Sequence, residues 1–307
     1  MDIVILLVGF SIGLVLLVKG ADEMVSSAVQ IALKFKLPSS IIGATFIGFG
    51  TSAPELFAST GAALKGDLDL GIGNIVGSNI ANSLLVVAVL YLALPKDFSQ
   101  KVKLNQISPV WMAILTTVFV STYVLTNEFP FLLGAVLLIL VIYVIYKMIS
   151  TESVDEGELL GEEKNYIWLR GGLSLLATLY GSQLVVDNAV AIAELFGVSS
   201  LIIGSTIIAI GTSLPEVAGT ISAAKMRKPD IVFGNIFGSN LFNIGLVGAT
   251  AIMISPGEIS SVIDYQLFIM YFVSFIVIFL SRNVIKRNSL LGYLFIVAYI
   301  LFLFSLF

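Results

Sequence analysis

Two glutamates, Glu55 and Glu216, stand in long apolar stretches, where a charged side chain is costly if the stretch crosses a membrane. Each closes the same six-residue pattern, Gly-Thr-Ser-x-Pro-Glu, and the two copies are 161 residues apart. No lysine or arginine lies near the middle of either stretch, so neither carboxylate has a sequence neighbour that could neutralise it. A bound cation or a proton must supply the compensation. The pair therefore indicates an ion pathway.

The proline before each glutamate sets the local backbone. Pro54 and Pro215 have no N–H, and their rings clash with the carbonyl group four residues back in a helix. We expect this clash to release carbonyl oxygens near Gly50–Thr51 in the first copy and near Gly211–Thr212 in the second. Released carbonyl groups at membrane depth are tolerated where they line a cavity, and there they can hold a hard cation.

A second pattern, Gly-Asn-x-x-Gly-Ser-Asn, follows each glutamate at the same offset of 161 residues. Its polar side chains recur at four-residue spacing and so share one helical face. These side chains are Asn74, Ser78 and Asn82 in the first half and Asn235, Ser239 and Asn243 in the second. The glutamate-bearing helices carry a similar face, formed by Gly48, Ser52, Glu55 and Ser59 in one copy and Ala209, Ser213, Glu216 and Thr220 in the other.

All the candidate ligands offer oxygen. The chain has no cysteine and no histidine, which excludes thiolate and imidazole metal sites. Carboxylate, hydroxyl, amide and main-chain oxygens suit Ca²⁺ or Na⁺. A simpler interpretation stays open for each hydroxyl, because serine and threonine in membrane helices also bond back to their own helix. The glycine pairs Gly73/Gly77 and Gly234/Gly238 are interpreted as positions of close packing.

The composition is typical of a polytopic helical membrane protein. Of 307 residues, 58% are hydrophobic and only 12% are charged, against about 25% charged in soluble domains. The first apolar segment lacks the basic start and cleavage site of a signal peptide, so we expect it to be a span. The first and sixth segments continue as amphipathic stretches to about Lys34 and Glu194. The ten predicted spans are roughly 3–20, 41–64, 70–94, 107–125, 129–149, 168–190, 202–224, 231–255, 263–281 and 289–307.

Positive charges predict the orientation of these spans. With the N-terminus outside, fourteen of the sixteen lysines and arginines fall on the inner side, and Lys65 is the one that falls outside. Five spans in each half is an odd number, so the halves must lie in opposite orientations. We therefore predict an all-α membrane protein of ten transmembrane helices in two inverted five-helix repeats, with the N-terminus and the C-terminus outside.

An acidic segment joins the two predicted repeats. The first repeat covers residues 1–150, the second covers 166–307, and residues 151–165 form a cytoplasmic linker with six acidic side chains. Such a cluster could suggest a regulatory calcium site, but the ligand spacing of an EF-hand is missing. We interpret the segment as a solvated linker.

The two paired patterns resemble the alpha-repeats of the calcium/cation antiporter superfamily, and the chain is most similar to prokaryotic sodium/calcium exchangers. The resemblance covers all ten predicted spans. It implies alternating access and exchange of Na⁺ for Ca²⁺ by two inverted halves. In the family the two pattern glutamates hold Ca²⁺ and share in Na⁺ binding, which here implies Glu55 and Glu216. The other implied ligands are the carbonyls of Thr51 and Thr212, the hydroxyls of Ser52 and Ser213, the side chains of Ser78, Asn82, Ser239 and Asn243, and the backbone of Gly48 and Ala209.

One departure from the family pattern bears on ion selectivity. Some relatives, including potassium-dependent exchangers, carry aspartate where this chain has Asn243. With asparagine at both Asn82 and Asn243, the predicted site keeps two formal negative charges, and this argues against a potassium requirement.

Three other functions compete with sodium/calcium exchange. A proton/calcium antiporter would use protonation of Glu55 or Glu216. A cation channel would favour a continuous polar path over one internal site. A membrane scaffold without transport leaves the two unpaired glutamates unexplained. The expected partners are the lipid bilayer of the cell membrane and the transported Ca²⁺ and Na⁺, with no cofactor, enzymatic activity, nucleic acid or protein partner implied.

Overall fold

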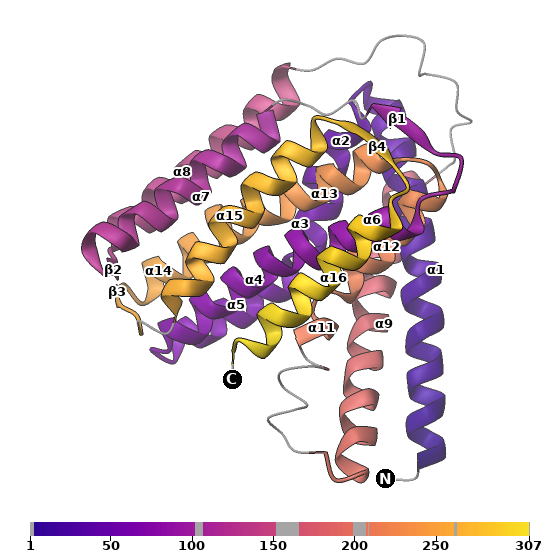
Figure 1. Cartoon of the computed structure of the whole chain (residues 1–307), viewed down its shortest axis with the longest axis horizontal. Coiled ribbons are helices and arrows are strands. Elements are labelled where there is room, and N and C mark those ends of the chain that lie inside the picture. Colours follow the sequence, from indigo (N-terminus) through magenta and orange to yellow (C-terminus); the bar gives the residue numbers. More distant parts are fainter. Residues whose placement is uncertain are drawn as a thin grey trace.

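The protein consists almost entirely of helices, with two long helices standing beside a bundle of shorter ones (Figure 1). The computed structural model describes residues 3–101, 107–151, 166–198, 207, 209–260 and 263–306. The long helices are α1 (Ile3–Phe35) and α9 (Ile167–Leu195), of 33 and 29 residues. At about 1.5 Å per residue, each is longer than the roughly 30 Å hydrocarbon core of a bilayer.

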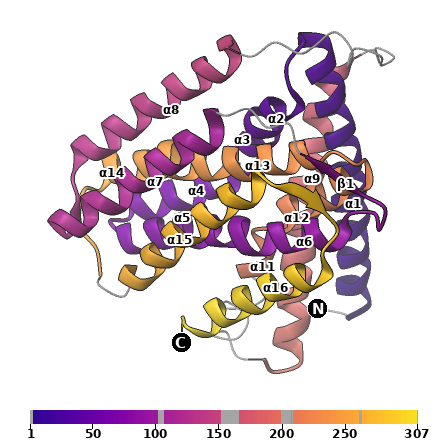
Figure 2. The ribbon, with the colours of Figure 1, turned by 45° about the horizontal axis from the view of Figure 1, so that its top comes forward.

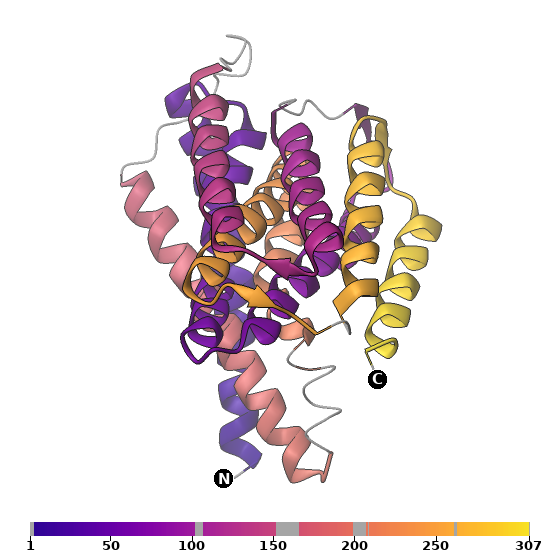
Figure 3. The ribbon, with the colours of Figure 1, turned by 90° about the vertical axis from the view of Figure 1, so that its left-hand side faces the viewer.

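Helices α1 and α9 pack against each other in opposite directions. Gly9 of α1 faces Asn188 of α9, and Gly20 faces Thr178, so rising residue numbers in one helix meet falling numbers in the other. Figure 3 shows the pair running past the rest of the molecule toward the end where the N-terminus lies. A Cβ atom on Gly20 or Gly181 would overlap backbone atoms of the opposite helix. The two backbones therefore touch, as small residues allow in membrane helix pairs.

Each glutamate-bearing span is broken just before its proline. In the first half the two parts, Ser39–Thr51 and Ala53–Leu64, are bent by 45° at the break. The backbone angles at the break match closely, with φ −84° and ψ 1° at Ser52 and φ −92° and ψ 3° at Ser213. The segments are α2 (Ser39–Ile42), the π-helical turn η1 (Gly43–Ile47), α3 (Gly48–Thr51) and α4 (Ala53–Leu64) in one half, and α11 (Ala209–Gly211) and α12 (Leu214–Lys225) in the other.

The spans that follow each glutamate form the centre of the bundle. In their most apolar windows 78% and 83% of residues are buried, against 22% for α1 and α9. Each contains a π-helical turn, and the two turns begin at the equivalent residues Asn82 and Asn243. Such turns are frequent at functional sites. The segments are α5 (Leu68–Ala81), η2 (Asn82–Val86) and α6 (Val87–Ala93), and then α13 (Pro229–Phe242), η5 (Asn243–Gly248) and α14 (Ala249–Ile254).

Four peripheral helices support this centre (Figure 2). Helices α7 (Ile107–Thr126) and α8 (Phe131–Thr151) pack on α13 and α14, while α15 (Asp264–Ser281) and α16 (Ser289–Phe304) pack on α5 and α6. Each half therefore supports the central span of the other. Two short antiparallel strand pairs also join loops of the two halves, a feature that the sequence analysis did not predict. They are β1 (Ser99–Lys101) with β4 (Val284–Lys286), and β2 (Glu128–Phe129) with β3 (Gly257–Glu258).

The predicted all-α membrane class is confirmed. Among the described residues, seven helices are long and apolar enough to cross a membrane, or eight if the bent pair counts as one span. The predicted continuation of the first and sixth segments to about Lys34 and Glu194 is also confirmed, because α1 ends at Phe35 and α9 at Leu195. The predicted seventh span, 202–224, lies partly outside the described residues, and nearly all of the acidic linker 151–165 lies outside them.

Candidate cation-binding site

The two glutamates are buried at the centre of the bundle. Glu55 is 4% exposed and Glu216 is 2% exposed. Each lies in the first turn of the helix that follows the break, α4 or α12. The partial positive charge of a helix N-terminus favours a carboxylate at this position. The breaks therefore place both acidic groups where the backbone offers some compensation for their burial.

Neither glutamate is fully satisfied by the protein. Ser78 Oγ donates to Glu55 Oε1 at 3.4 Å, and the Thr51 side chain lies within hydrogen-bonding reach of Glu216. The second carboxylate oxygen of each glutamate, Oε2, is buried without a partner among the described residues. The two carboxyl groups are also close enough to interact electrostatically. Two neighbouring buried carboxylates without cationic partners are strongly unfavourable, so the arrangement requires a cation or protons.

Buried hydroxyl groups flank both glutamates along the chain. Ser52 and Ser213, at the two breaks, are each 3% exposed, and Ser52 Oγ has no partner within the described part of the chain. Thr51 Oγ1 lies 3.4 Å from Ser239 Oγ, so the first glutamate-bearing span contacts α13 of the other half. Thr220, one turn beyond Glu216, is also buried, and its hydroxyl is unpartnered in the described structure.

The first glutamate-bearing span approaches α13 at backbone distance. Ser239 Oγ lies 3.3 Å from the Gly48 carbonyl oxygen, and a Cβ atom at Gly48 would come within 2.9 Å of the Ser239 backbone nitrogen. Side chains at Gly234 and Gly238 would likewise overlap the carbonyls of Ser40 and Ala44. The close-packing interpretation of Gly234/Gly238 is confirmed. For Gly73/Gly77 the equivalent partners, residues 201 and 205, lie outside the described residues.

Helix α9 covers the breaks of both halves. Its Leu175 side chain lies against Gly50, and its Val186 side chain lies against Gly211. Ser182 Oγ donates to the Gly211 carbonyl oxygen at 3.2 Å, so this released carbonyl has a partner on α9. This bond leaves the broken helix, as expected for a carbonyl group that the break has released.

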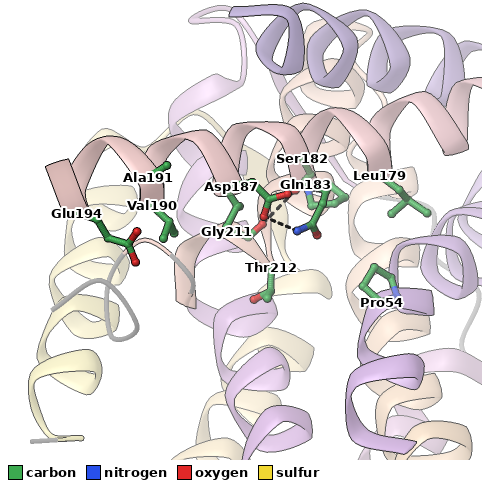
Figure 4. Close-up of a pocket in the computed structure, with 12 residues that line it drawn as sticks. Pro54, Leu179, Ser182, Gln183, Asp187, Val190, Ala191, Glu194, Gly211 and Thr212 are labelled. Carbon is green, nitrogen blue, oxygen red and sulfur yellow. Dashed lines mark hydrogen bonds between the residues drawn. The ribbon is translucent and has the colours of Figure 1, made fainter. Parts of the chain in front are cut away.

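A cavity of about 410 Å³ lies between α9 and the second break (Figure 4). Thr212 is exposed and lines this cavity, whereas its repeat equivalent Thr51 is fully buried. Asp187 and Glu194 of α9 also line it, and Gln183 Nε2 donates to Asp187 Oδ1 at 2.7 Å. The surroundings of the two breaks therefore differ, although their sequences and backbone angles match.

Four asparagines connect the two central spans. Asn82 Nδ2 donates to Asn240 Oδ1 at 3.1 Å, and Asn243 Nδ2 donates to Asn79 Oδ1 at 3.1 Å. The offset of 161 residues converts one of these bonds into the other. All four side chains are at most 2% exposed, and Asn243 Oδ1 has no partner among the described residues.

Comparison with known proteins decides the family. The family model described as "Sodium/calcium exchanger protein" matches residues 5–151 and 166–307. The chain belongs to the sodium/calcium exchanger family. It is 39% identical to CaxA of Alkalimonas amylolytica, provisionally named an antiporter, over 81% of each chain. It is 32% identical to the sodium/calcium exchanger MaX1 of Methanosarcina acetivorans, over 77% of this chain and 79% of MaX1. A solved structure of the sodium-calcium exchanger NCX_Mj aligns over 100% of both chains with a TM-score of 0.84 and 28% identity.

Family membership and the apolar helices together show that this exchanger is a multi-pass membrane protein that exchanges Ca²⁺ for another cation. The structure buries most of the predicted site residues, and contacts join Glu55, Ser78, Thr51, Glu216 and Ser239 to one another. The buried site residues are Thr51, Ser52, Glu55, Ser78, Asn82, Ser213, Glu216, Ser239 and Asn243, each at most 7% exposed. Gly48 lies beside them through its contact with Ser239. Thr212 faces the cavity instead, and the side chain of Ala209 is outside the described structure.

The sequence analysis missed Asn79 and Asn240, the hydrogen-bond partners of Asn243 and Asn82. Both belong to the Gly-Asn-x-x-Gly-Ser-Asn pattern, but they fall outside the four-residue spacing that selected the other polar residues of that pattern. Their recurrence at the same place in both copies is the signal that could have found them.

Proposed function

We propose that this exchanger is a secondary active antiporter that exchanges Na⁺ for Ca²⁺ by alternating access. The observation that carries the proposal is the pair of buried, neighbouring carboxyl groups of Glu55 and Glu216, each with an unpartnered oxygen in the described structure. Two carboxylates balance the charge of one Ca²⁺. The same oxygen-rich cluster suits Na⁺, which the names of the family, MaX1 and NCX_Mj include.

In this proposal the carboxylates of Glu55 and Glu216 bind Ca²⁺ and take part in Na⁺ binding. The hydroxyls of Ser52 and Ser213 are neutral ligands and favour the monovalent ion. The unpartnered Ser52 Oγ and Asn243 Oδ1 support these assignments, because each is a buried oxygen with unused bonding capacity among the described residues. The remaining proposed ligands are the backbones of Gly48, Thr51, Ala209 and Thr212 and the side chains of Ser78, Asn82 and Ser239.

We further propose the finer topology. Ten spans form two inverted five-helix repeats, 1–150 and 166–307, with both termini outside and the acidic linker 151–165 in the cytoplasm. Three observations support the inversion. Helices α1 and α9, which correspond in the two halves, run antiparallel. The two asparagine bonds interchange under the repeat offset. The fourteen positive charges of the predicted inner side follow the positive-inside rule.

Charge balance explains why the protein would exchange ions and not leak them. With both glutamates ionised and no cation bound, an occluded site of low dielectric would hold two uncompensated negative charges, which is prohibitive. One Ca²⁺ or several Na⁺ remove that charge. Only loaded forms then pass between the two access states, so movement of one ion requires return of the other.

Helices α1 and α9 are the proposed moving part. They are less buried than the central spans, and they touch each other through glycine backbones. Helix α9 lies against both breaks, through Leu175 at Gly50 and Val186 at Gly211. Sliding or tilting of the pair would uncover one break and cover the other. The cavity beside Thr212 supports this proposal, because it is a partial opening at one of the two breaks.

Uptake of ⁴⁵Ca²⁺ into proteoliposomes under separate ion gradients tests the proposal. We expect an outward Na⁺ gradient to drive uptake at equal pH, and a pH gradient without Na⁺ to drive none. Uptake driven by the pH gradient alone would instead establish proton/calcium antiport. Uptake that needs neither gradient and follows only the membrane potential would indicate a channel.

A further inference from the structure

The two cross-repeat asparagine bonds have a defined direction. In each, the amide nitrogen of the residue that begins a π turn, Asn82 or Asn243, points at the oxygen of an asparagine in the other half. The remaining oxygen of Asn243 then faces away from the bond and is buried without a partner in the described chain. A side-chain amide has one acceptor end and one donor end, so a rotation by 180° would exchange them.

A methionine sets the direction of the bond between Asn243 and Asn79. Asn79 Nδ2 lies 3.6 Å from Met270 Sδ of α15. A thioether sulfur accepts hydrogen bonds but has no hydrogen to donate, so it selects the NH₂ end of Asn79. The oxygen of Asn79 is then turned toward Asn243, and it in turn selects the NH₂ end of Asn243. Met270 and both asparagines are at most 1% exposed, so water does not compete for these groups.

A second methionine does the same in the other half. Asn240 Nδ2 lies 3.7 Å from Met112 Sδ of α7 and 3.3 Å from Ser83 Oγ. The oxygen of Asn240 accepts from Asn82. Met112 and Met270 are not equivalent under the repeat offset, since residue 273 is a valine. Each half therefore places an acceptor-only atom against the asparagine of the other half, from a position that the repeat offset does not relate to its counterpart.

We propose that Asn79 and Asn240, held by Met270 and Met112, are positioning residues that make Asn243 and Asn82 present oxygen, and not NH₂, to the transported cation. The proposal rests on the function proposed above. Its physical basis is the sign of the amide dipole: an oxygen end is a ligand for Ca²⁺ or Na⁺, whereas an NH₂ end removes a ligand and repels the ion. In each half a neutral acceptor on a peripheral helix thus sets the direction of an amide dipole at the binding site. We call the two chains of contacts, Met270–Asn79–Asn243 and Met112–Asn240–Asn82, relays.

Replacement of the sulfur is the sharpest perturbation. Met270→Leu keeps nearly the same volume and hydrophobicity, a type of change that cores tolerate well. It removes the acceptor that selects one orientation of Asn79. We expect Ca²⁺ to bind roughly tenfold more weakly, the scale of one hydrogen bond to a charged group. Met148→Leu is the matched control, because Met148 of α8 is also buried and accepts a bond at 3.6 Å from Ser108, which is not one of the asparagines whose direction is at issue.

A substitution at the end of the relay separates positioning from packing. The two carboxylate oxygens of the Asn243→Asp variant are equivalent, so there is no amide polarity left to set at that position. In that background Met270→Leu should cause no further loss of Ca²⁺ affinity, because Asn79 without the sulfur acceptor is free to turn its NH₂ end to the carboxylate that the Asn243→Asp variant places there. Met112→Leu should still weaken it roughly tenfold, because that relay acts on Asn82.

The experiment is calorimetric titration of the purified full-length chain with Ca²⁺, together with its unfolding temperature in the absence of Ca²⁺. The expected result is a loss with Met270→Leu, none with Met148→Leu, and no further loss when Met270→Leu is added to Asn243→Asp. A wild-type affinity for Met270→Leu would overturn the inference, and so would an equal loss in both backgrounds. Failure of the wild-type chain to bind Ca²⁺ would instead overturn the proposed function.

Discussion

Replacement of Glu55 by glutamine should separate ion binding from folding. Glu55→Gln keeps the shape of the side chain and removes one formal negative charge. The wild-type carboxylate is 4% exposed, and its Oε2 has no partner in the described structure, so the fold gains little from the charge itself. We therefore expect the cation-free variant to unfold at the wild-type temperature or slightly above it.

The effect on Ca²⁺ should be large. With one carboxylate left, bound Ca²⁺ would leave one buried positive charge unbalanced, and an uncompensated charge of this kind costs about 3–5 kcal/mol. That cost corresponds to an affinity at least about a hundredfold weaker. At a Ca²⁺ concentration roughly 100 times the wild-type dissociation constant, the wild-type protein gains about 2.7 kcal/mol of stability from binding, and the variant should gain about half a kcal/mol or less.

Thermal unfolding in detergent, with and without Ca²⁺, measures both effects in one experiment. We expect a clear Ca²⁺-dependent rise in the unfolding temperature of the wild-type chain and of Glu128→Gln, which alters an exposed carboxylate. We expect almost none for Glu55→Gln. A full Ca²⁺-dependent rise in Glu55→Gln would refute the reasoning, because the charge at that position would then be irrelevant to binding.

Four further substitutions and one control test other parts of the account. Ser52→Ala and Ser213→Ala should weaken the Na⁺ dependence of exchange more than Ca²⁺ binding, and equal losses for both ions would argue against separate Na⁺ positions. Gly238→Ala should destabilise the fold by about 1–3 kcal/mol and so lower the unfolding temperature, because the added Cβ would overlap the Ala44 carbonyl. Gly61→Ala is the control and should leave the unfolding temperature unchanged, because its Cβ would meet no described atom within 4 Å. Asn243→Asp should add a pH or K⁺ dependence to transport, and an unchanged ion requirement would remove that residue from the site.

The placement of the two glutamates in the candidate site could be predicted from the sequence because its determinants are local. A proline fixes where a helix breaks, and a glutamate in an apolar stretch has few stable environments. The structure accordingly places Glu55 and Glu216 in the first turn after matching breaks. The packing of Gly234 and Gly238 followed from spacing in the same way.

The features that depend on distant segments could not be predicted. The repeat suggested equal roles for Thr51 and Thr212, but Thr212 lines a cavity beside α9, whereas Thr51 is fully buried. The bonds from Asn79 and Asn240 end on methionines of α15 and α7 that do not follow the repeat. The strand pairs are two or three residues long, and no pattern of that length specifies pairing across the chain.

The location of a bound divalent cation tests the central claim most directly. Anomalous diffraction from crystals of the full-length chain soaked with Sr²⁺, which has the charge and the oxygen preference of Ca²⁺, would show where the ion binds. The account predicts one dominant peak between the carboxylates of Glu55 and Glu216, and loss of that peak when Na⁺ replaces Sr²⁺. A peak at another place, or a peak between the glutamates that Na⁺ does not displace, would contradict it.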